Sequence, residues 1–135
     1  MRKYLLDSNA ANLFIYRRCG VYERAIRERK TGAVIGTAIP VVGEVLGGVE
    51  YSSSREFNLP IVEGELQLLR IWPYDLTSAR TYAIVYATLR RQGITMQPID
   101  RMIAAVGLTL PDCTVVTSDG DFSRVPGLRV ENWAI

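Results

Sequence analysis

Four positions in the chain carry a carboxylate within or beside apolar sequence, where such groups are uncommon. They are Asp7, Glu44, Asp100 and the segment Asp119–Asp121. A buried carboxylate is usually paired with a base or bound to a cation, because removing an isolated charge from water is costly. If these side chains meet, their mutual repulsion favours binding of Mg²⁺ or Mn²⁺, ions that prefer oxygen ligands. Such a site can polarise a phosphate and activate a water molecule, which is the chemistry of phosphodiester hydrolysis.

The surrounding sequence makes Glu44 the most informative of these acids. It is the only charged residue in Val41–Val49, and a helix that is apolar on every side is normally buried. Each acid also has an ordinary structural explanation. Asp7 is suited to capping a following helix and Asp100 to the first turn of one, while Asp119–Asp121 contains an Asp-Gly turn. Glu44 needs no special role if it points outward from a helix whose glycines face solvent.

The absence of histidine narrows the possible chemistry. Without imidazole the chain has no Ser-His-Asp or Cys-His catalysis and no His-containing metal site. Cys19 and Cys113 form no Cys-x-x-Cys pair, which excludes a zinc ribbon or a thioredoxin-like site, and we predict two small buried thiols in a reducing cytosol. Ser8, Asn9 and Thr117 remain as groups that orient the carboxylates or a scissile phosphate by hydrogen bonds.

Short apolar runs alternate with longer stretches of helical periodicity, and these elements must position the acids. Strands are predicted at 3–6, 33–37, 71–74, 114–117 and 128–131. Helices are predicted at 8–16, 21–30, 40–51, 56–70, 76–92 and 99–110, with a break near Pro60. The alternation predicts an α/β fold with a mostly parallel central sheet and helices on both faces.

A length of 135 residues is typical of one domain, so we predict a single domain over 1–135. In an open parallel sheet the ligand site lies beyond the carboxyl ends of the strands. Asp7 and Asp119 follow predicted strands, whereas Glu44 and Asp100 lie on helices expected to pack against the sheet. The fold can therefore bring all four acids to one end of the molecule.

The charge and hydropathy of the chain argue against a strongly basic nucleic-acid-binding protein, a secreted protein and a membrane protein. A net charge of +2 is too small to mark a nucleic-acid binder by its overall field. Asp7 interrupts the apolar N-terminal run before a signal sequence is complete, and Ala33–Val49 contains too many glycines and prolines for a membrane helix. We therefore predict a cytoplasmic protein without membrane association. The arginine clusters suit phosphate oxygens but are best explained as solvated helix faces. Arg101, beside Asp100, could contact a phosphate or a neighbouring carboxylate, and we expect it to face solvent from the first turn of its helix.

Four segments of the chain resemble, in order, the acidic motifs of PIN-domain ribonucleases. They are Tyr4–Asn9, Gly43–Gly48, Pro98–Ala105 and Val116–Phe122. The closing segment Phe122–Trp133 is similar to the C-terminus of VapC-type toxins of bacterial toxin–antitoxin pairs. The resemblance covers essentially the whole chain and implies a three-layer α/β/α sandwich.

The same resemblance implies a Mg²⁺- or Mn²⁺-dependent endoribonuclease that cuts cellular RNA. Asp7, Glu44 and Asp100 are then the metal-binding catalytic acids, Asp119 is the fourth, and Asp121 contributes beside it. A small cognate antitoxin encoded next to the gene would inhibit the enzyme, and a homodimer would form through the helices flanking the acidic end.

The sequence departs from the family pattern at a few positions. Ser8 stands where threonine is common, and Gly47 where a larger residue is usual. The apolar segment Leu46–Tyr51, together with the amphipathic stretch after Glu56, is a candidate groove for the antitoxin.

Two other functions fit parts of the sequence. One is a non-catalytic PIN-like scaffold that binds RNA or protein, in which the acids serve only as caps and turns; the intact set of four acids argues against it. The other is a phosphotransfer module with an aspartate after its first strand. Asn9 stands where the phosphatase motif has a second Asp, and Lys3 and Lys30 are the only lysines, so the strand-end lysine of such modules is missing.

Overall fold

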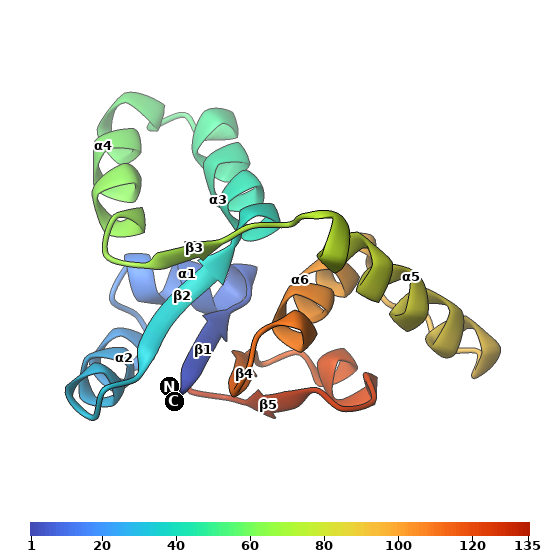
Figure 1. Ribbon diagram of the computed structural model, residues 1–135. Helices are drawn as coiled ribbons and strands as arrows, with labels where there is room; N and C mark the ends of the chain where they lie inside the picture. Colours follow the sequence, from blue (N-terminus) through green and yellow to red (C-terminus); the bar gives the residue numbers. More distant parts are fainter.

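The computed structural model describes residues 1–135 and contains one five-stranded sheet (Figure 1). Its strands are β1 (Lys3–Leu6), β2 (Val34–Ala38), β3 (Arg70–Trp72), β4 (Cys113–Val116) and β5 (Arg129–Glu131). Their order is β3-β2-β1-β4-β5, and all four neighbouring pairs are parallel. Tyr4 of the central strand lies opposite Ile35 on one side and Thr114 on the other. The predicted sheet is confirmed, and it is wholly parallel.

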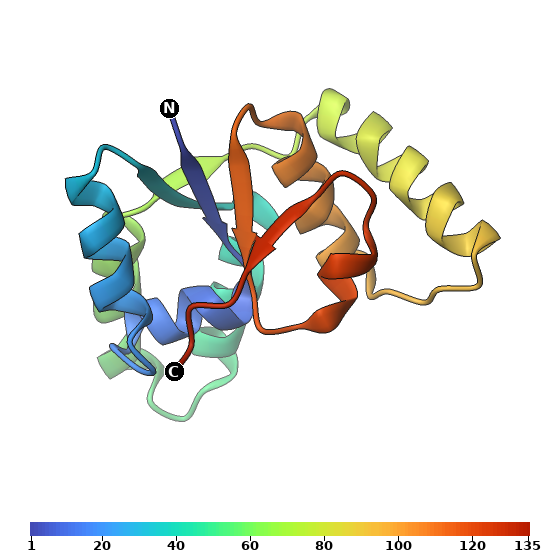
Figure 2. The ribbon, with the colours of Figure 1, turned by 90° about the horizontal axis from the view of Figure 1, so that it is seen from below.

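Six α-helices and one 3₁₀ helix connect the strands. They are α1 (Ser8–Ile15), α2 (Val21–Lys30), α3 (Ile39–Tyr51), α4 (Arg55–Leu66), α5 (Leu76–Arg91), α6 (Pro98–Thr109) and η1 (Gly120–Arg124). The chain steps outward from β1 to β3 and then crosses back to β4, so right-handed crossovers place α1–α4 and α5–α6 on opposite faces. Figures 1 and 2 both show α1–α4 grouped on one side of the molecule and α5 with α6 on the other. The predicted three-layer α/β/α sandwich is confirmed.

The core is built around β1 and β4, which are buried on both faces. Leu5, Leu6, Val115 and Val116 are almost completely inaccessible to solvent, as expected for the middle strands of a parallel sheet. The chain runs from β1 outward to β2 and β3 on one side, and then returns from β3 to β4 on the other side of β1. The carboxyl ends of β1 and β4 therefore form the switch point at which open α/β sheets bind ligands.

The segment around Pro60 differs from the prediction. Helix α4 continues through Pro60 without a break and ends at Leu66, and β3 begins at Arg70 rather than Ile71. Proline removes one backbone donor from a helix, which leaves the carbonyl four residues earlier without its partner. Glu56 at that position and Pro60 itself are both exposed, so this part of the helix faces solvent and the missing hydrogen bond does not have to be replaced within the protein.

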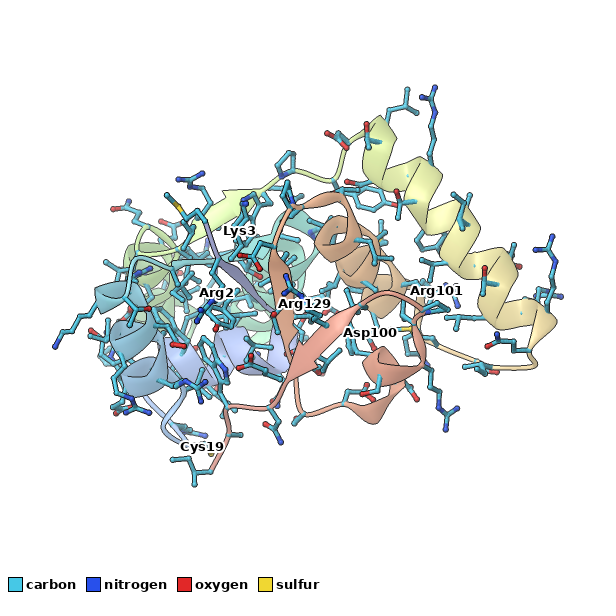
Figure 3. All side chains as sticks on the ribbon, turned by 60° about the horizontal axis from the view of Figure 1, so that its bottom comes forward. Arg2, Lys3, Cys19, Asp100, Arg101 and Arg129 are labelled. Atoms are coloured by element: carbon cyan, nitrogen blue, oxygen red, sulfur yellow. The ribbon has the colours of Figure 1, made fainter.

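The two cysteines also differ from each other in environment. Cys113 is buried as predicted, but Cys19 is exposed and the prediction for it is wrong. Cys19 lies in the turn between α1 and α2, has a positive φ of 57°, and its carbonyl accepts a hydrogen bond from the Ile135 N–H at 2.9 Å. Figure 3 shows Cys19 at the periphery of the molecule.

None of the helices combines the length and the hydropathy that crossing a lipid bilayer requires.

Candidate active site

Asp7 occupies the first position after β1, at the switch point of the sheet. Its backbone N–H donates to the Val116 carbonyl at 3.1 Å, and its Oδ1 accepts from the Ala10 N–H at 2.8 Å as the N-cap of α1. The side chain is only 5% exposed. Burial raises the pKa of Asp7, repulsion by Asp119 and Glu44 adds to the rise, and the Thr117 and Ala10 hydrogen bonds oppose it. The predicted capping role of Asp7 is confirmed. The same side chain also lies near Asp119 and Glu44 in the candidate site.

Glu44 reaches the carboxyl end of β1 from α3. This helix follows β2, which pairs with the edge of β1 opposite to β4. The Ser8 hydroxyl donates to Glu44 Oε1, which links the first turn of α1 to the second turn of α3. Helix α3 buries only its valine face, with Val41 and Val45 in the core, while Glu44 and its neighbouring glycines are exposed. The expectation of a helix buried on every side is therefore wrong, because the missing glycine side chains leave that face open rather than packed.

The segment after β4 supplies two further acids. Thr117 is buried, and its hydroxyl oxygen accepts the Asp119 N–H at 2.9 Å. Asp119 Oδ1 in turn accepts the Asp121 N–H at 2.9 Å, so the predicted Asp-Gly turn forms and caps η1. Asn9 on α1 donates through Nδ2 to Ser118 Oγ at 3.2 Å. These bonds fix the loop beside the carboxyl end of β1.

Asp100 is the acid on which the others act most strongly. It lies in the first turn of α6 and is partly buried. Burial raises the pKa of Asp100 to about 6, and repulsion by Asp119, Asp7, Glu44 and Asp121 contributes in that order. All five predicted acids are therefore close enough to interact electrostatically, although they come from four separate segments of the chain.

The donor chemistry of this cluster fits a hard cation, but its present spacing does not form a closed site. The acids offer only carboxylate oxygens, the ligands that Mg²⁺ and Mn²⁺ prefer. However, no three carboxylate or cysteine side chains lie close enough together to hold one metal ion. Ala10, Ser8 and Asp121 donate hydrogen bonds to Asp7, Glu44 and Asp119, respectively, and orient each carboxylate separately. A bound cation would thus need intervening waters, which Mg²⁺ commonly retains, or a small inward movement of these side chains.

Two hollows border Glu44. One, of about 400 Å³, lies between α1, α3 and α4 and includes Tyr16, Gly48 and Asn58. The other, of about 610 Å³, lies between the first turns of α3 and α6 and includes Ile39 and Met102. A further polar hollow of about 490 Å³ lies at the opposite ends of the strands, beside Arg2 and Arg129, and contains none of the site acids (Figure 3).

Sequence reasoning missed several groups that help to position the site. The buried Thr37 hydroxyl donates to the Leu6 carbonyl at 2.6 Å and ties the end of β2 to the end of β1. Ser118 receives the Asn9 amide. Both partners are distant in sequence, so only the assembled sheet reveals them.

The prediction for Arg101 is also wrong, because this side chain does not face solvent. It is partly buried and donates hydrogen bonds to the Tyr82 hydroxyl and the Met96 carbonyl. The acceptors lie on α5 and in the turn that precedes α6, out of reach of any local sequence signal.

Comparison with known proteins agrees with this architecture. The PIN-domain profile matches residues 4–128. A relative from Salmonella typhimurium, named tRNA(fMet)-specific endonuclease VapC, is 32% identical over 136 residues, covering 98% of this chain and 99% of that protein.

Solved structures show the same likeness. A chain in the crystal structure of DNA-bound VapBC from Salmonella typhimurium is 31% identical, with a TM-score of 0.86 over 99% of this chain and 100% of that one. A chain of VapBC2 from Rickettsia felis, solved with a promoter DNA fragment, has a TM-score of 0.88 at 24% identity, covering 97% of this chain and 98% of that one, and so shares the fold. The chain therefore belongs to the PIN-domain family and, within it, to the VapC ribonucleases.

Proposed function

We propose that this chain is a divalent-metal-dependent endoribonuclease, the toxin of a toxin–antitoxin pair, and that it acts on RNA in the cytoplasm. The observation that carries the proposal is that acids from four segments gather at the switch point of the sheet. Asp7 is bonded to the end of β4, Ser8 beside it donates to Glu44, and Asn9 donates to the loop that carries Asp119. The first turn of α6, which carries Asp100, shares a hollow with Glu44. The full-length relatives named as VapC nucleases support RNA as the substrate.

Asp7, Glu44, Asp100 and Asp119 are the residues that would hold the cation, with Asp121 contributing beside Asp119. When bound, Mg²⁺ or Mn²⁺ supplies charge neutralisation at the scissile phosphate and lowers the pKa of a coordinated water. The hydrogen bonds accepted by Asp7, Glu44 and Asp119 orient these carboxylates before the substrate arrives. Because Asp100 has a pKa of about 6, part of it is protonated below neutral pH, and cation affinity should rise as the pH increases through that value.

We assign the hollow between α1, α3 and α4 to the antitoxin. Glu44 lies on its rim, so a segment seated there contacts the acidic site directly. Large apolar side chains are exposed on α3 and α4 beside it, with Tyr51 95% and Phe57 73% exposed. Exposed apolar surface of this kind is typical of a protein interface. The structural relatives were solved as VapBC toxin–antitoxin complexes, which supports a partner of this kind.

We assign the opposite hollow, between α3 and α6, to a homodimer contact. Ile39 and Leu76 are exposed around it, and Ile84 is exposed further along α5. These side chains flank the acidic end, and Glu44 also lines this hollow, so a second copy of the chain seated there would border the acidic cluster.

The experiment that tests the enzymatic proposal is RNA cleavage by the wild type, Asp7→Asn and Glu44→Gln, with Mg²⁺, with Mn²⁺ and with chelator. We expect cleavage only with a divalent cation and none by either variant, although both remain folded. Glu63→Gln is the matched control, because Glu63 is an exposed acid on α4 outside the site. Unchanged cleavage in chelator refutes the metal-dependent mechanism, whereas RNA binding without cleavage under all conditions favours the scaffold function.

The antitoxin assignment is tested by co-expression with a short DNA-binding protein encoded by a neighbouring reading frame. We expect the pair to copurify and RNA cleavage to stop. Tyr51→Asp and Phe57→Asp should weaken that inhibition while cleavage by the free enzyme is unchanged. If neither substitution weakens the inhibition, the antitoxin does not bind in the hollow between α1, α3 and α4.

A further inference from the structure

A small hollow near the start of α6 is lined by two arginines. It encloses about 200 Å³ where the last turn of α5 meets the loop before α6. Arg90 on α5 and Arg101 on α6 both line it, with Tyr86 and the loop residue Thr95. We call this hollow the arginine pocket.

Arg101 is held in a fixed orientation within the arginine pocket. Its Nε and Nη2 donate to the Tyr82 hydroxyl at 3.2 Å and 3.0 Å, and its Nη1 donates to the Met96 carbonyl. Its guanidinium carbon lies 5.5 Å from the Tyr82 ring centre and 5.2 Å from that of Tyr86. These two rings stack with an interplanar angle of 17° and form a platform for the cation. Three of the five guanidinium N–H donors are thus used, and two remain for a ligand.

Arg90 approaches the same platform from α5. Its Nη1 donates to the Tyr86 hydroxyl at 3.1 Å, and its guanidinium carbon lies 5.8 Å from the Tyr86 ring centre. Both guanidinium groups therefore lie near the Tyr86 ring. Both cations are positioned by neutral acceptors and aromatic rings.

Neither arginine has an acidic partner in the protein. The seven ion pairs of the structure involve Arg2, Arg17, Arg24, Arg55 and Arg129, and none of them includes Arg90 or Arg101. A partly buried guanidinium has lost part of its hydration, and neutral hydrogen-bond acceptors do not cancel its charge. Arg101 is such a group, whereas Arg90 is exposed. Their two charges around one hollow create a positive potential that an anion with several oxygens satisfies, and phosphate matches the arginine fork.

We propose that the arginine pocket binds a backbone phosphate of the RNA substrate, next to the phosphodiester bond that is cut. This inference rests on the proposed nuclease function and adds to it a contact that places the strand. Arg101 directly follows Asp100, and consecutive Cα atoms lie about 3.8 Å apart. Figure 3 shows the two residues at the same end of α6, with Arg101 reaching toward α5. Side chains at consecutive helix positions point in different directions, and none of the site acids lines the pocket. A strand that crosses the acids therefore has to bend around the first turn of α6 to reach it.

Arg90 also has a simpler explanation, because basic side chains in a last helical turn stabilise the helix dipole. Arg91 shares that turn, is exposed and does not line the pocket, so it provides a matched control. A role limited to the helix dipole predicts similar effects of removing either charge. The phosphate contact predicts an effect only at Arg90 and Arg101.

The first measurement is RNA binding in a Glu44→Gln background, which prevents cleavage. The probe is a fluorescein-labelled single-stranded RNA of mixed sequence, followed by anisotropy over a series of salt concentrations. Each phosphate contact on a single strand contributes about 0.7 to the slope of log K against log salt. We expect Arg90→Gln and Arg101→Gln each to reduce the slope by about 0.7 and to weaken binding on the order of fivefold. Arg91→Gln should change neither quantity.

Arg101→Lys separates charge from geometry. Lysine keeps the positive charge but lacks the planar fork that carries the Tyr82 and Met96 hydrogen bonds. We expect this variant to keep the salt slope while it loses part of the affinity. In cleavage assays without the Glu44 substitution, Arg101→Gln should raise KM more than it lowers kcat, because it removes a contact made before and during the reaction.

The outcomes separate this inference from the proposed function. If the wild type cleaves RNA and Arg90→Gln and Arg101→Gln behave like Arg91→Gln, the phosphate site is wrong and the nuclease stands. If no RNA is cleaved but the slopes fall as expected, the pocket stands and the nuclease proposal is wrong. If either substitution changes the mass measured by light scattering, the pocket is a subunit contact, which overturns the phosphate assignment.

Discussion

Removing the charge of Asp100 should stabilise the metal-free protein while it abolishes catalysis. Raising the pKa of Asp100 from 3.8 to about 6 corresponds to about 3 kcal/mol of unfavourable free energy for the ionised form. Asp100 is only partly buried, so solvent screening reduces this to about 1–1.5 kcal/mol. Asp100→Asn keeps the shape of the side chain without the charge. We expect it to raise the melting temperature in chelator at pH 7.5 by roughly 3–5 °C.

The pH dependence of this effect has a definite sign. Below pH 3.8 the carboxyl is protonated in the folded and unfolded states alike, and it costs no stability. As the pH rises, Asp100 ionises in the unfolded chain first and in the folded protein only near pH 6. The folded wild type therefore loses stability across this window, and the loss is complete above it. The difference between Asp100→Asn and the wild type should grow from pH 4 to pH 7.

Thermal unfolding in chelator and in excess Mg²⁺, at pH 4 and pH 7.5, tests this reasoning. Mg²⁺ should stabilise the wild type more than Asp100→Asn, because the cation relieves the repulsion that the substitution removes. Asp112→Asn is the control, since the hydrogen bond from Arg129 lowers the pKa of Asp112 and its removal should give no stabilisation at pH 7.5. A variant Asp100→Asn that is no more stable than the wild type at pH 7.5, or equally shifted at pH 4, would show that the acids do not repel at this position.

Substitutions of Asp7, Thr117 and Gly36 also have definite expected outcomes. Asp7→Asn keeps an acceptor for the cap of α1 and should yield a folded, inactive protein, whereas Asp7→Ala should also lose about 1 kcal/mol in urea unfolding. Thr117→Val leaves the Asp119 N–H without its acceptor, so we expect a loss of about 1–2 kcal/mol and slower RNA cleavage, both restored in Thr117→Ser. Gly36→Ala places a Cβ 2.4 Å from a backbone oxygen of β3 and should cost about 2 kcal/mol or more, while Gly64→Ala, which meets open space, should be neutral or stabilising. Equal effects at the two glycines would contradict the packing at β2.

The strands and the acids that follow them were predictable because their signals are local. The first strand and Asp7 fall where the apolar run ends, and the segment around Thr117 follows the same rule. Parallel strands align their carboxyl ends, so two acids after neighbouring strands had to lie close together. Asp100 could be assigned to the same site because its helix precedes β4 and runs back along the sheet. The start of that helix therefore lies near the carboxyl ends of the strands.

Features that depend on tertiary contacts were not predictable from sequence. Pro60 indicates a helix break, but its exposure lets the helix continue. The sequence predicts that Arg101 faces solvent, but in the folded protein it donates a hydrogen bond to Tyr82 on α5, which no local pattern indicates. Cys19 lies in a loop whose backbone conformation, rather than any apolar pattern, sets its exposure.

The strand order also fixes when the enzyme becomes competent during synthesis. Asp7 and Glu44 leave the ribosome early, but β1 has no neighbour on its second edge until β4 has been made. The contact between Asn9 and Ser118 joins residues 109 positions apart. A nascent chain that ends within α5 carries neither Asp100 nor the loop after β4, so under the proposed function it should not yet cleave RNA.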